Sequence, residues 1–118
     1  MQELYAKKDE IEALLMQEVE TFRRSGIKYA ENEAEYRKAV RVETLKERAK
    51  GTAVGLTNDL VRGLDYVADL KQASMSAEAL YESSKEYINV LKIRLRMVND
   101  EITRAWNSGG YSDNGGMR

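Results

Sequence analysis

The first half of the chain repeats apolar or small residues at alternating steps of four and three. The row consists of Leu15, Val19, Phe22, Gly26, Tyr29, Glu33, Tyr36 and Val40. This heptad-like spacing predicts an α-helix with one face packed against another helix, although Glu33 is out of character there. Because the phase does not shift at Gly26, we predict one continuous helix from about Gln2 to Ala49. A kink at Ser25 and Gly26 is the alternative.

The strongest helix-breaking signals follow in the stretch KGTAVGLTNDLVRGL, residues 50–64. Glycine readily adopts the left-handed backbone that ends a helix, and Thr or Asp readily caps the next one. The predicted order is a turn at Gly51 and Gly55, an N-cap at Thr57, a short helix over residues 58–62, a stop at Gly63 and an N-cap at Asp65.

A second long helix is predicted from Asp65 to about Trp106, where the helical period resumes. Its main row is Tyr66, Leu70, Ala73, Ala77, Leu80, Ser84, Tyr87, Leu91, Arg94 and Val98, and a shifted row is Ile88, Leu95 and Ile102. The remainder, residues 107–118, is rich in glycine and has no periodicity, so we predict a disordered tail.

The connection is short, which predicts that the two long helices are antiparallel neighbours. With the turn centred near Gly55, large residues of one helix face small residues of the other. Gly26 then provides the space that Tyr87 fills. The predicted fold is all-α: one domain over residues 1–106, built as a long coiled-coil-like antiparallel hairpin with a short helical turn at its tip.

Charge supports this arrangement. Residues 1–35 hold nine acids and five bases, and residues 36–62 hold three acids and seven bases. Residues 63–90 hold five acids and two bases, and residues 91–118 hold three acids and five bases. An antiparallel hairpin therefore places acidic segments opposite basic ones, which favours one register and orientation.

Apolar residues also lie outside the predicted seam, and an isolated hairpin would leave them exposed. A second copy packed about a two-fold axis would cover them and complete a four-helix bundle. The predicted interface of this homodimer is Leu14, Ile27, Ile88, Leu95 and Ile102. A kinked three-helix monomer is the alternative.

Composition limits the chemistry of the 118-residue chain. It contains no Pro, Cys or His, and its net charge is −1. The commonest general base, metal ligand and nucleophilic thiol are therefore absent, and alternate glutamates at Glu31, Glu33 and Glu35 do not share a helix face. We expect no catalytic residue, no metal and no cofactor. With no apolar span and no signal-peptide core, a cytoplasmic protein is expected.

Two surfaces are candidates for binding. The apolar tip could hold a partner protein through Leu56, Leu60, Val61 and Arg62, or these side chains could merely plug the end of the bundle. The alternative function is nucleic-acid binding, in which basic side chains would contact phosphates. The candidates for it are Arg37, Lys38, Arg41, Lys46, Arg48, Lys50, Lys92 and Arg96.

Three stretches, KYAENEAEYRKA, KGTAVGLTNDLVRG and INVLKIRLRMVNDEITRAW, resemble small helical proteins encoded by phages and prophages of Gram-positive bacteria. The matching residues are Tyr29, Ala30, Glu31, Glu33, Tyr36, Arg37, Leu60, Val61, Arg62, Gly63, Lys92, Arg96 and Trp106. The resemblance covers about residues 27–106. It implies a phage setting near replication and recombination functions, in the host cytoplasm, but no activity. The helical pattern and its uncovered apolar residues lead us to expect an oligomeric protein-interaction module, whose partner in a phage setting would be a replication protein or a host defence factor.

Overall fold

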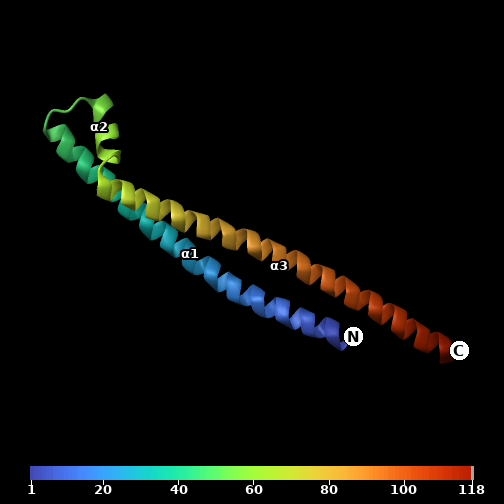
Figure 1. Cartoon of the computed structure of the whole chain (residues 1–118). Coiled ribbons are helices and arrows are strands. Elements are labelled where there is room, and N and C mark those ends of the chain that lie inside the picture. The colour runs from blue at the N-terminus through green and yellow to red at the C-terminus, as the bar shows by residue number, and fades with distance from the viewer. Residues whose placement is uncertain (118) are drawn as a thin grey trace. The chain divides into compact units, whose positions relative to one another are not determined.

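The computed structural model describes residues 1–117, with the side chains of residues 1–108. Residues 1–117 form three helices and no strand: α1, Gln2–Ala49; α2, Val54–Arg62; and α3, Asp65–Met117 (Figure 1). The predicted all-α class is confirmed, and α1 is a single helix with Gly26 in its interior. α3 continues beyond the predicted end near Trp106. The predicted disordered tail falls largely on residues whose side chains lie outside those described, and it stays a prediction.

Contacts group the chain into two compact units. The central unit is Phe22–Ser83, and the terminal unit combines Met1–Thr21 with Ser84–Arg118. α1 and α3 each run through both units, so the division does not fall at a break between helices.

Within each unit, α1 and α3 are antiparallel neighbours. In the central unit, the hydroxyl of Tyr66, near the start of α3, donates a hydrogen bond to Glu43, late in α1. The ring of Tyr81, farther along α3, stacks on Phe22, which comes earlier in α1. In the terminal unit, the indole N–H of Trp106 donates a hydrogen bond to the hydroxyl of Tyr5 at 2.9 Å. The antiparallel arrangement predicted from the short connection is therefore present in each unit.

The packed face of α3 keeps every second residue of the predicted row and replaces each of the others by the residue one position later. Its most covered positions are Val67, Leu70, Ser74, Ala77, Tyr81, Ser84, Ile88, Leu91, Leu95, Val98, Ile102 and Ala105. Tyr66, Leu80 and Tyr87, which the prediction placed on the seam, are exposed. The error arose because large apolar side chains marked the predicted row, whereas the observed row includes Ser74, whose hydroxyl is satisfied by Glu33 across the seam.

This row corrects the predicted dimer interface. Ile88 and Ile102 are buried and Leu95 is half-buried within the chain, so they belong to its own core. Leu14 is half-buried, and Ile27 is exposed. The three α3 residues were assigned to the surface only because their row had been taken as secondary.

Gly26 provides space for an aromatic ring, but the ring belongs to Tyr81. A Cβ atom built at Gly26 would lie 3.0 Å from the Tyr81 ring, and no Tyr87 atom is among its neighbours within 4 Å. Tyr81 stacks on Phe22 with a centroid distance of 4.7 Å and lies 6.1 Å from the Tyr29 ring. The predicted Tyr87 partner is wrong because the helix register is displaced by nearly two turns.

The chain leaves α1 through a Schellman motif centred on Gly51. Among the described residues, Gly51 is the one with positive φ, 85°. Its N–H bonds the carbonyl of Arg48 at 3.0 Å, and the N–H of Thr52 bonds that of Glu47 at 3.3 Å. These bonds satisfy carbonyls that a helix end otherwise leaves unpaired.

α2 begins earlier than predicted. Ala53 is its N-cap, Gly55 is helical, and Thr57 lies inside the helix with its hydroxyl donating to the carbonyl of Ala53 at 2.9 Å. Thr57 is therefore no cap. Gly63 ends α2 as predicted, whereas Asp65 is the first residue of α3 rather than its cap.

Replacing Gly26 by Leu should destabilise the fold by about 1–3 kcal/mol, despite the better helix propensity of Leu, because the side chain would overpack the Tyr81 ring. Gly55→Ala is the matched control. A Cβ at Gly55 meets nothing within 4 Å, so this variant should gain up to about 1 kcal/mol. Urea unfolding measures both changes, and a Gly26→Leu variant as stable as the wild type would contradict the packing.

Candidate docking surface on α2

α2 is amphipathic, and its two faces have different roles. Thr57 and Val61 are buried on one face. Leu56 and Leu60 lie one turn apart on another, where 59% and 50% of their surfaces are exposed. We call these two residues the leucine ridge. Val54 and Leu64, at the two ends of α2, are exposed as well.

The structure separates the four residues predicted for partner binding. Leu56, Leu60 and Arg62 are exposed, so they are available to a partner. Val61 is 1% exposed and belongs to the core. The prediction is wrong for Val61, because a helix of two and a half turns must bury one face to stay in place. The alternative that these side chains plug the end of the hairpin therefore holds for Val61, and partner binding by the exposed residues stays a prediction.

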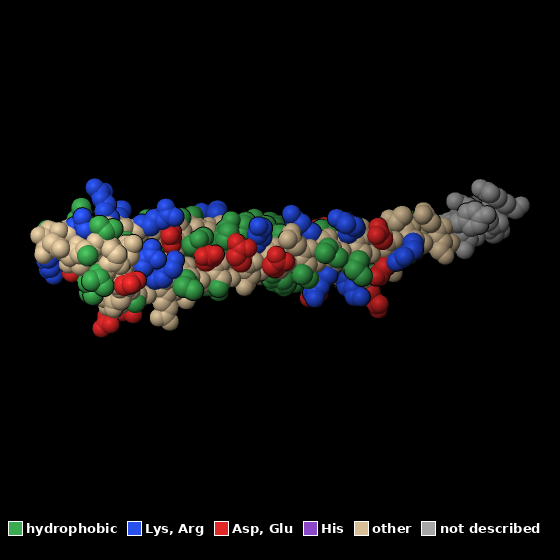
Figure 2. All heavy atoms as spheres, turned by 90° about the horizontal axis from the view of Figure 1, so that it is seen from above, with side chains coloured by type: hydrophobic (Ala, Val, Ile, Leu, Met, Phe, Trp, Pro, Cys, Tyr) green, Lys and Arg blue, Asp and Glu red, His purple; other side chains and the backbone are tan. Residues whose placement is uncertain are grey.

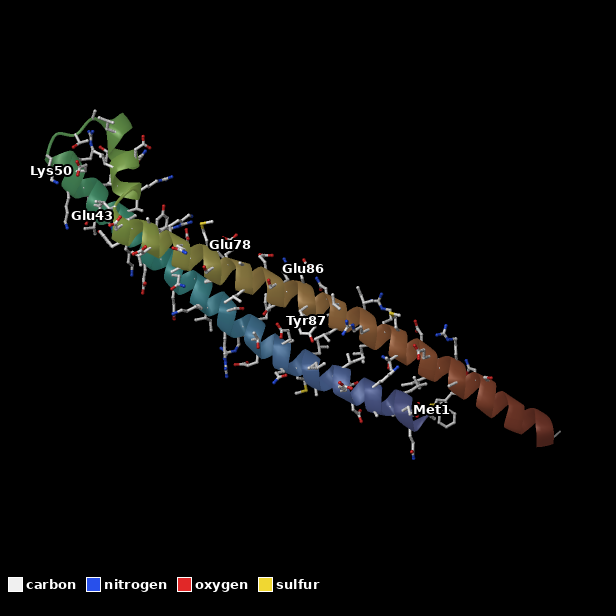
Figure 3. All side chains as sticks on the ribbon, in the orientation of Figure 1. Met1, Glu43, Lys50, Glu78, Glu86 and Tyr87 are labelled. Atoms are coloured by element: carbon white, nitrogen blue, oxygen red, sulfur yellow. The ribbon has the colours of Figure 1, made fainter. Side chains whose placement is uncertain are left out.

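The end of α1, which leads toward α2, carries basic residues that are partly paired with glutamates. Lys46 pairs with Glu43 at 3.3 Å within α1, and Lys50, which directly follows α1, pairs with Glu47 at 3.6 Å. Figure 3 labels Glu43, near the end of α1, and Lys50, at the start of the connection to α2. The guanidinium of Arg48 donates to the carbonyl of Thr52 at 3.0 Å, which fixes the connection leading into α2.

The predicted nucleic-acid contacts are all exposed but are divided between the units. Arg37, Lys38, Arg41, Lys46, Arg48 and Lys50 lie in the central unit, and Lys92 and Arg96 lie in the terminal unit. Arg37 is paired with Glu33 at 3.1 Å. Figure 2 shows acidic and basic side chains interspersed on the face that it presents. Such a surface attracts phosphates less than a continuous basic stripe does.

Carboxylates of α1 bind hydroxyl groups of α3 at three places. The pairs are Glu18 with Ser84 at 2.8 Å, Glu33 with Ser74 at 2.6 Å, and Glu43 with Tyr66. In each pair the hydroxyl donates to the carboxylate. Ser74 and Ser84 are buried, so these bonds remove the cost of burying their hydroxyls. Sequence reasoning missed the pairs, although serines recurring on a heptad row opposite glutamates were the available signal.

Two of these bonds, to Glu33 and to Glu43, lower the pKa values of these glutamates. The hydrogen bond from Ser74, followed by that from Arg37, holds the pKa of Glu33 below its usual value. The hydroxyl of Tyr66 lowers the pKa of Glu43, and Glu43 in turn raises the pKa of Tyr66. Each glutamate is therefore bound more strongly as the carboxylate than as the acid.

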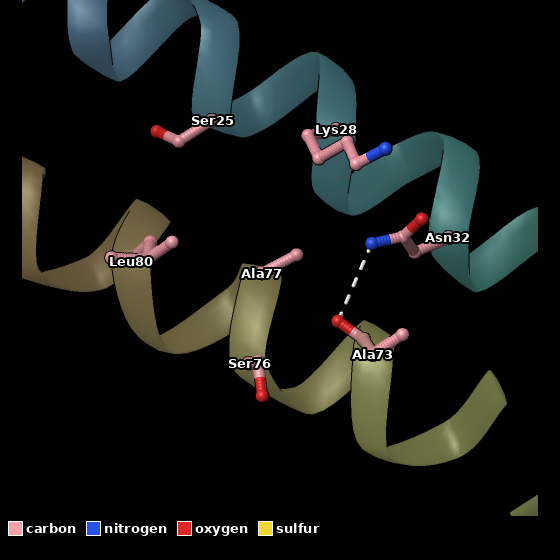
Figure 4. Close-up of a pocket in the computed structure, with 7 residues that line it drawn as sticks. All are labelled: Ser25, Lys28, Asn32, Ala73, Ser76, Ala77 and Leu80. Carbon is pink, nitrogen blue, oxygen red and sulfur yellow. Dashed lines mark hydrogen bonds between the residues drawn. The ribbon is translucent and has the colours of Figure 1, made fainter. Parts of the chain in front are cut away.

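An open, mainly apolar groove lies between α1 and α3 in the central unit (Figure 4). Its lining consists of Ser25, Lys28, Asn32, Ala73, Ser76, Ala77 and Leu80. The amide of Asn32 donates to the carbonyl of Ala73 at 3.3 Å, and the hydroxyl of Ser25 donates to the carbonyl of Phe22 at 3.0 Å. Neither hydroxyl of the lining has a neighbouring base that could activate it as a nucleophile.

The described residues contain no group of three carboxylates that could hold a metal ion. No helix within residues 1–117 combines the length and the apolar character that crossing a membrane requires. The chain matches no protein-family model, no curated protein and no solved structure. The resemblance to small phage proteins therefore stays a prediction.

Acid should weaken the fold partly through Glu33. Because its pKa is lowered in the folded chain, its contribution is present above the unfolded pKa of about 4.3 and is lost as pH falls through the folded value. Ser74→Ala removes the main cause, so the pKa of Glu33 should rise toward the unfolded value in this variant. NMR titration of the carboxyl carbon measures it. Exposed Ser76→Ala is the control, and an unchanged Glu33 pKa in Ser74→Ala would contradict the assignment.

The two faces of α2 should respond differently to one substitution. Val61→Ala should cost about 2 kcal/mol of stability through lost burial and a cavity. Val54→Ala, on the same helix but 66% exposed, should change stability by less than about 0.5 kcal/mol. Thermal unfolding compares the two variants, and equal losses would show that Val61 does not anchor α2.

Proposed function

We propose that this chain is a non-enzymatic helical module that self-associates and binds another protein through the leucine ridge of α2. The observation that carries the proposal is the exposure of Leu56 and Leu60 on a helix whose neighbouring face is anchored in the core. Large apolar side chains held together on a fixed surface are typical of protein-binding sites.

Local structure favours α2 as a preformed binding element. Val61 and Thr57 hold one face, the Gly51 turn fixes the approach from α1, and Gly63 bonds the carbonyl of Asp59 at the other end. A partner therefore does not have to order this helix on binding, which lowers the entropic cost of association.

The surroundings of the ridge indicate the chemistry of the partner. Residues 36–62 carry seven bases and three acids, and Arg62 is exposed at the end of α2. An amphipathic helix with an apolar stripe and acidic flanks fits this combination, because the stripe would cover the leucines and the acids would speed association. In the phage setting that the sequence suggests, the partner is a replication protein or a host defence factor in the cytoplasm.

Self-association is the second part of the proposal. Exposed apolar residues recur on α3 outside the seam, including Leu80, Tyr87, Val90 and Met97. A second copy would cover such residues and form the predicted four-helix bundle.

Binding through the ridge should be lost when both leucines become polar. The double variant Leu56→Ser with Leu60→Ser should retain the wild-type melting temperature but capture at least about tenfold less partner from phage-infected cells. The matched control is Met75→Ser with Ile93→Ser, which also removes two exposed apolar side chains, from α3. If the wild type, the leucine variant and the control variant captured the same partner equally well, the proposal would be overturned.

The nucleic-acid alternative predicts a different response. Fluorescence anisotropy with labelled duplex and single-stranded DNA, at about 50 and 200 mM salt, would show tight and steeply salt-dependent binding if the basic residues contact phosphates. We expect no such binding, because glutamates pair with several of these cations.

A further inference from the structure

The terminal unit has a shallow groove between α1 and α3 whose floor is apolar and whose rim carries both signs of charge. Ile11, Leu14, Met97 and Val98 supply the apolar lining. Lys7 and Glu10 on α1, and Arg94 and Glu101 on α3, complete it. The lining therefore includes two basic and two acidic residues and has no net charge.

The apolar lining continues along the exposed side of α3. Met97 is 56% exposed, and Val90 and Tyr87, about two and three turns before it respectively, are also exposed. In the heptad of α3, these residues and Arg94 occupy two adjacent positions on the same side of the seam. A partner helix lying on this side would contact all of them.

Arg94 and Glu101 are placed symmetrically about Met97. They are one heptad apart and therefore on one face, with Met97 close to the midpoint between them. Neither forms a hydrogen bond or an ion pair with another described residue. If two copies of α3 lay antiparallel with Met97 at the centre, the basic residue of each copy would therefore face the acidic residue of the other.

We propose that a second copy of this chain covers the groove, with the two α3 helices antiparallel and Met97 near the two-fold axis. Arg94 of each copy then meets Glu101 of the other, so both charges find partners in one symmetric interface. Lys7 and Glu10, one turn apart on α1, extend the same alternation of charge at the rim. A second copy carries the same charges at the same spacing, so a two-fold axis pairs all of them, whereas an unrelated partner would match this arrangement only by chance.

The inference rests on the proposed self-association and specifies its geometry. It replaces the interface predicted from sequence, retaining only Leu14. The three predicted α3 residues are covered within the chain, whereas Met97, one residue before the seam position Val98, is exposed.

Reversing charges tests the register. In Arg94→Glu, two acids face each other across the axis, and in Glu101→Arg, two bases do. Each variant alone should dimerise at least about tenfold more weakly than the wild type. Mixed in equal amounts, the two variants should associate to within a few-fold of the wild-type affinity, because each then meets its opposite charge. Analytical ultracentrifugation measures all three samples, and circular dichroism verifies that each variant is helical.

A cysteine cross-link tests the position of the axis without changing any charge. The chain contains no Cys, so Met97→Cys introduces a single thiol. Two such thiols near the axis should form an intermolecular disulfide under mild oxidation, since this bond requires Cα atoms within about 7 Å. Met75→Cys is the control, because Met75 is 58% exposed on α3 but lies on another side of the helix. It should cross-link at least about tenfold more slowly.

The outcomes separate this inference from the broader proposal. A wild-type mass of 13.5 kDa at concentrations up to about 100 µM would overturn both the interface and self-association. A wild-type dimer whose charge variants associate normally, and whose Met97→Cys and Met75→Cys variants cross-link equally, would overturn this interface alone. Rescue by mixing the charge variants, together with selective cross-linking at Met97, would support it.

Discussion

The structure depends on how closely α1 and α3 approach each other along one heptad row. None of the residues of α1, all of which the structure describes, is buried, so α1 contributes half-covered side chains rather than a core of its own. The stability of such a pair comes from close shape matching at each contact, because little apolar surface is removed from water. The Tyr81 ring against Gly26, stacked on Phe22, shows how this is achieved in the central unit.

The same constraint explains the composition of the row. In the central unit it includes Ser74 and Ala77, which are small enough to let the helices approach, whereas in the terminal unit it includes Leu91 and Ile102. Glutamates of α1 accept hydrogen bonds from the serines and thereby satisfy polar groups that would otherwise be buried without partners. These bonds have a definite direction and spacing, so they oppose a slip in register that apolar contacts alone would tolerate.

A single packed row leaves apolar side chains exposed elsewhere, and their distribution suggests two separate uses. The leucine ridge lies on a short helix anchored by Val61, in a basic neighbourhood, which suits a partner with acidic flanks. The side of α3 that carries Met97 has balanced charges arranged symmetrically, which suits a second copy of the chain. Self-association and partner binding would then use different surfaces, so that one need not compete with the other.

The sequence by itself determined the helical class, the bounds of α1, the continuity of that helix through Gly26 and the left-handed turn at Gly51. These features depend on local periodicity and on the backbone preferences of glycine. It could not determine which of two adjacent rows of α3 faces α1, because Tyr66, Leu80 and Tyr87 make the wrong row look more hydrophobic. Only the tertiary structure decided that Ser74 is inside, that Val61 is an anchor and Leu60 is exposed, and that Tyr81 rather than Tyr87 meets Gly26. The physical reason is that helix register is fixed by pairwise fit and hydrogen bonding between segments far apart in the chain, and a one-residue change rotates a helix face by about 100°.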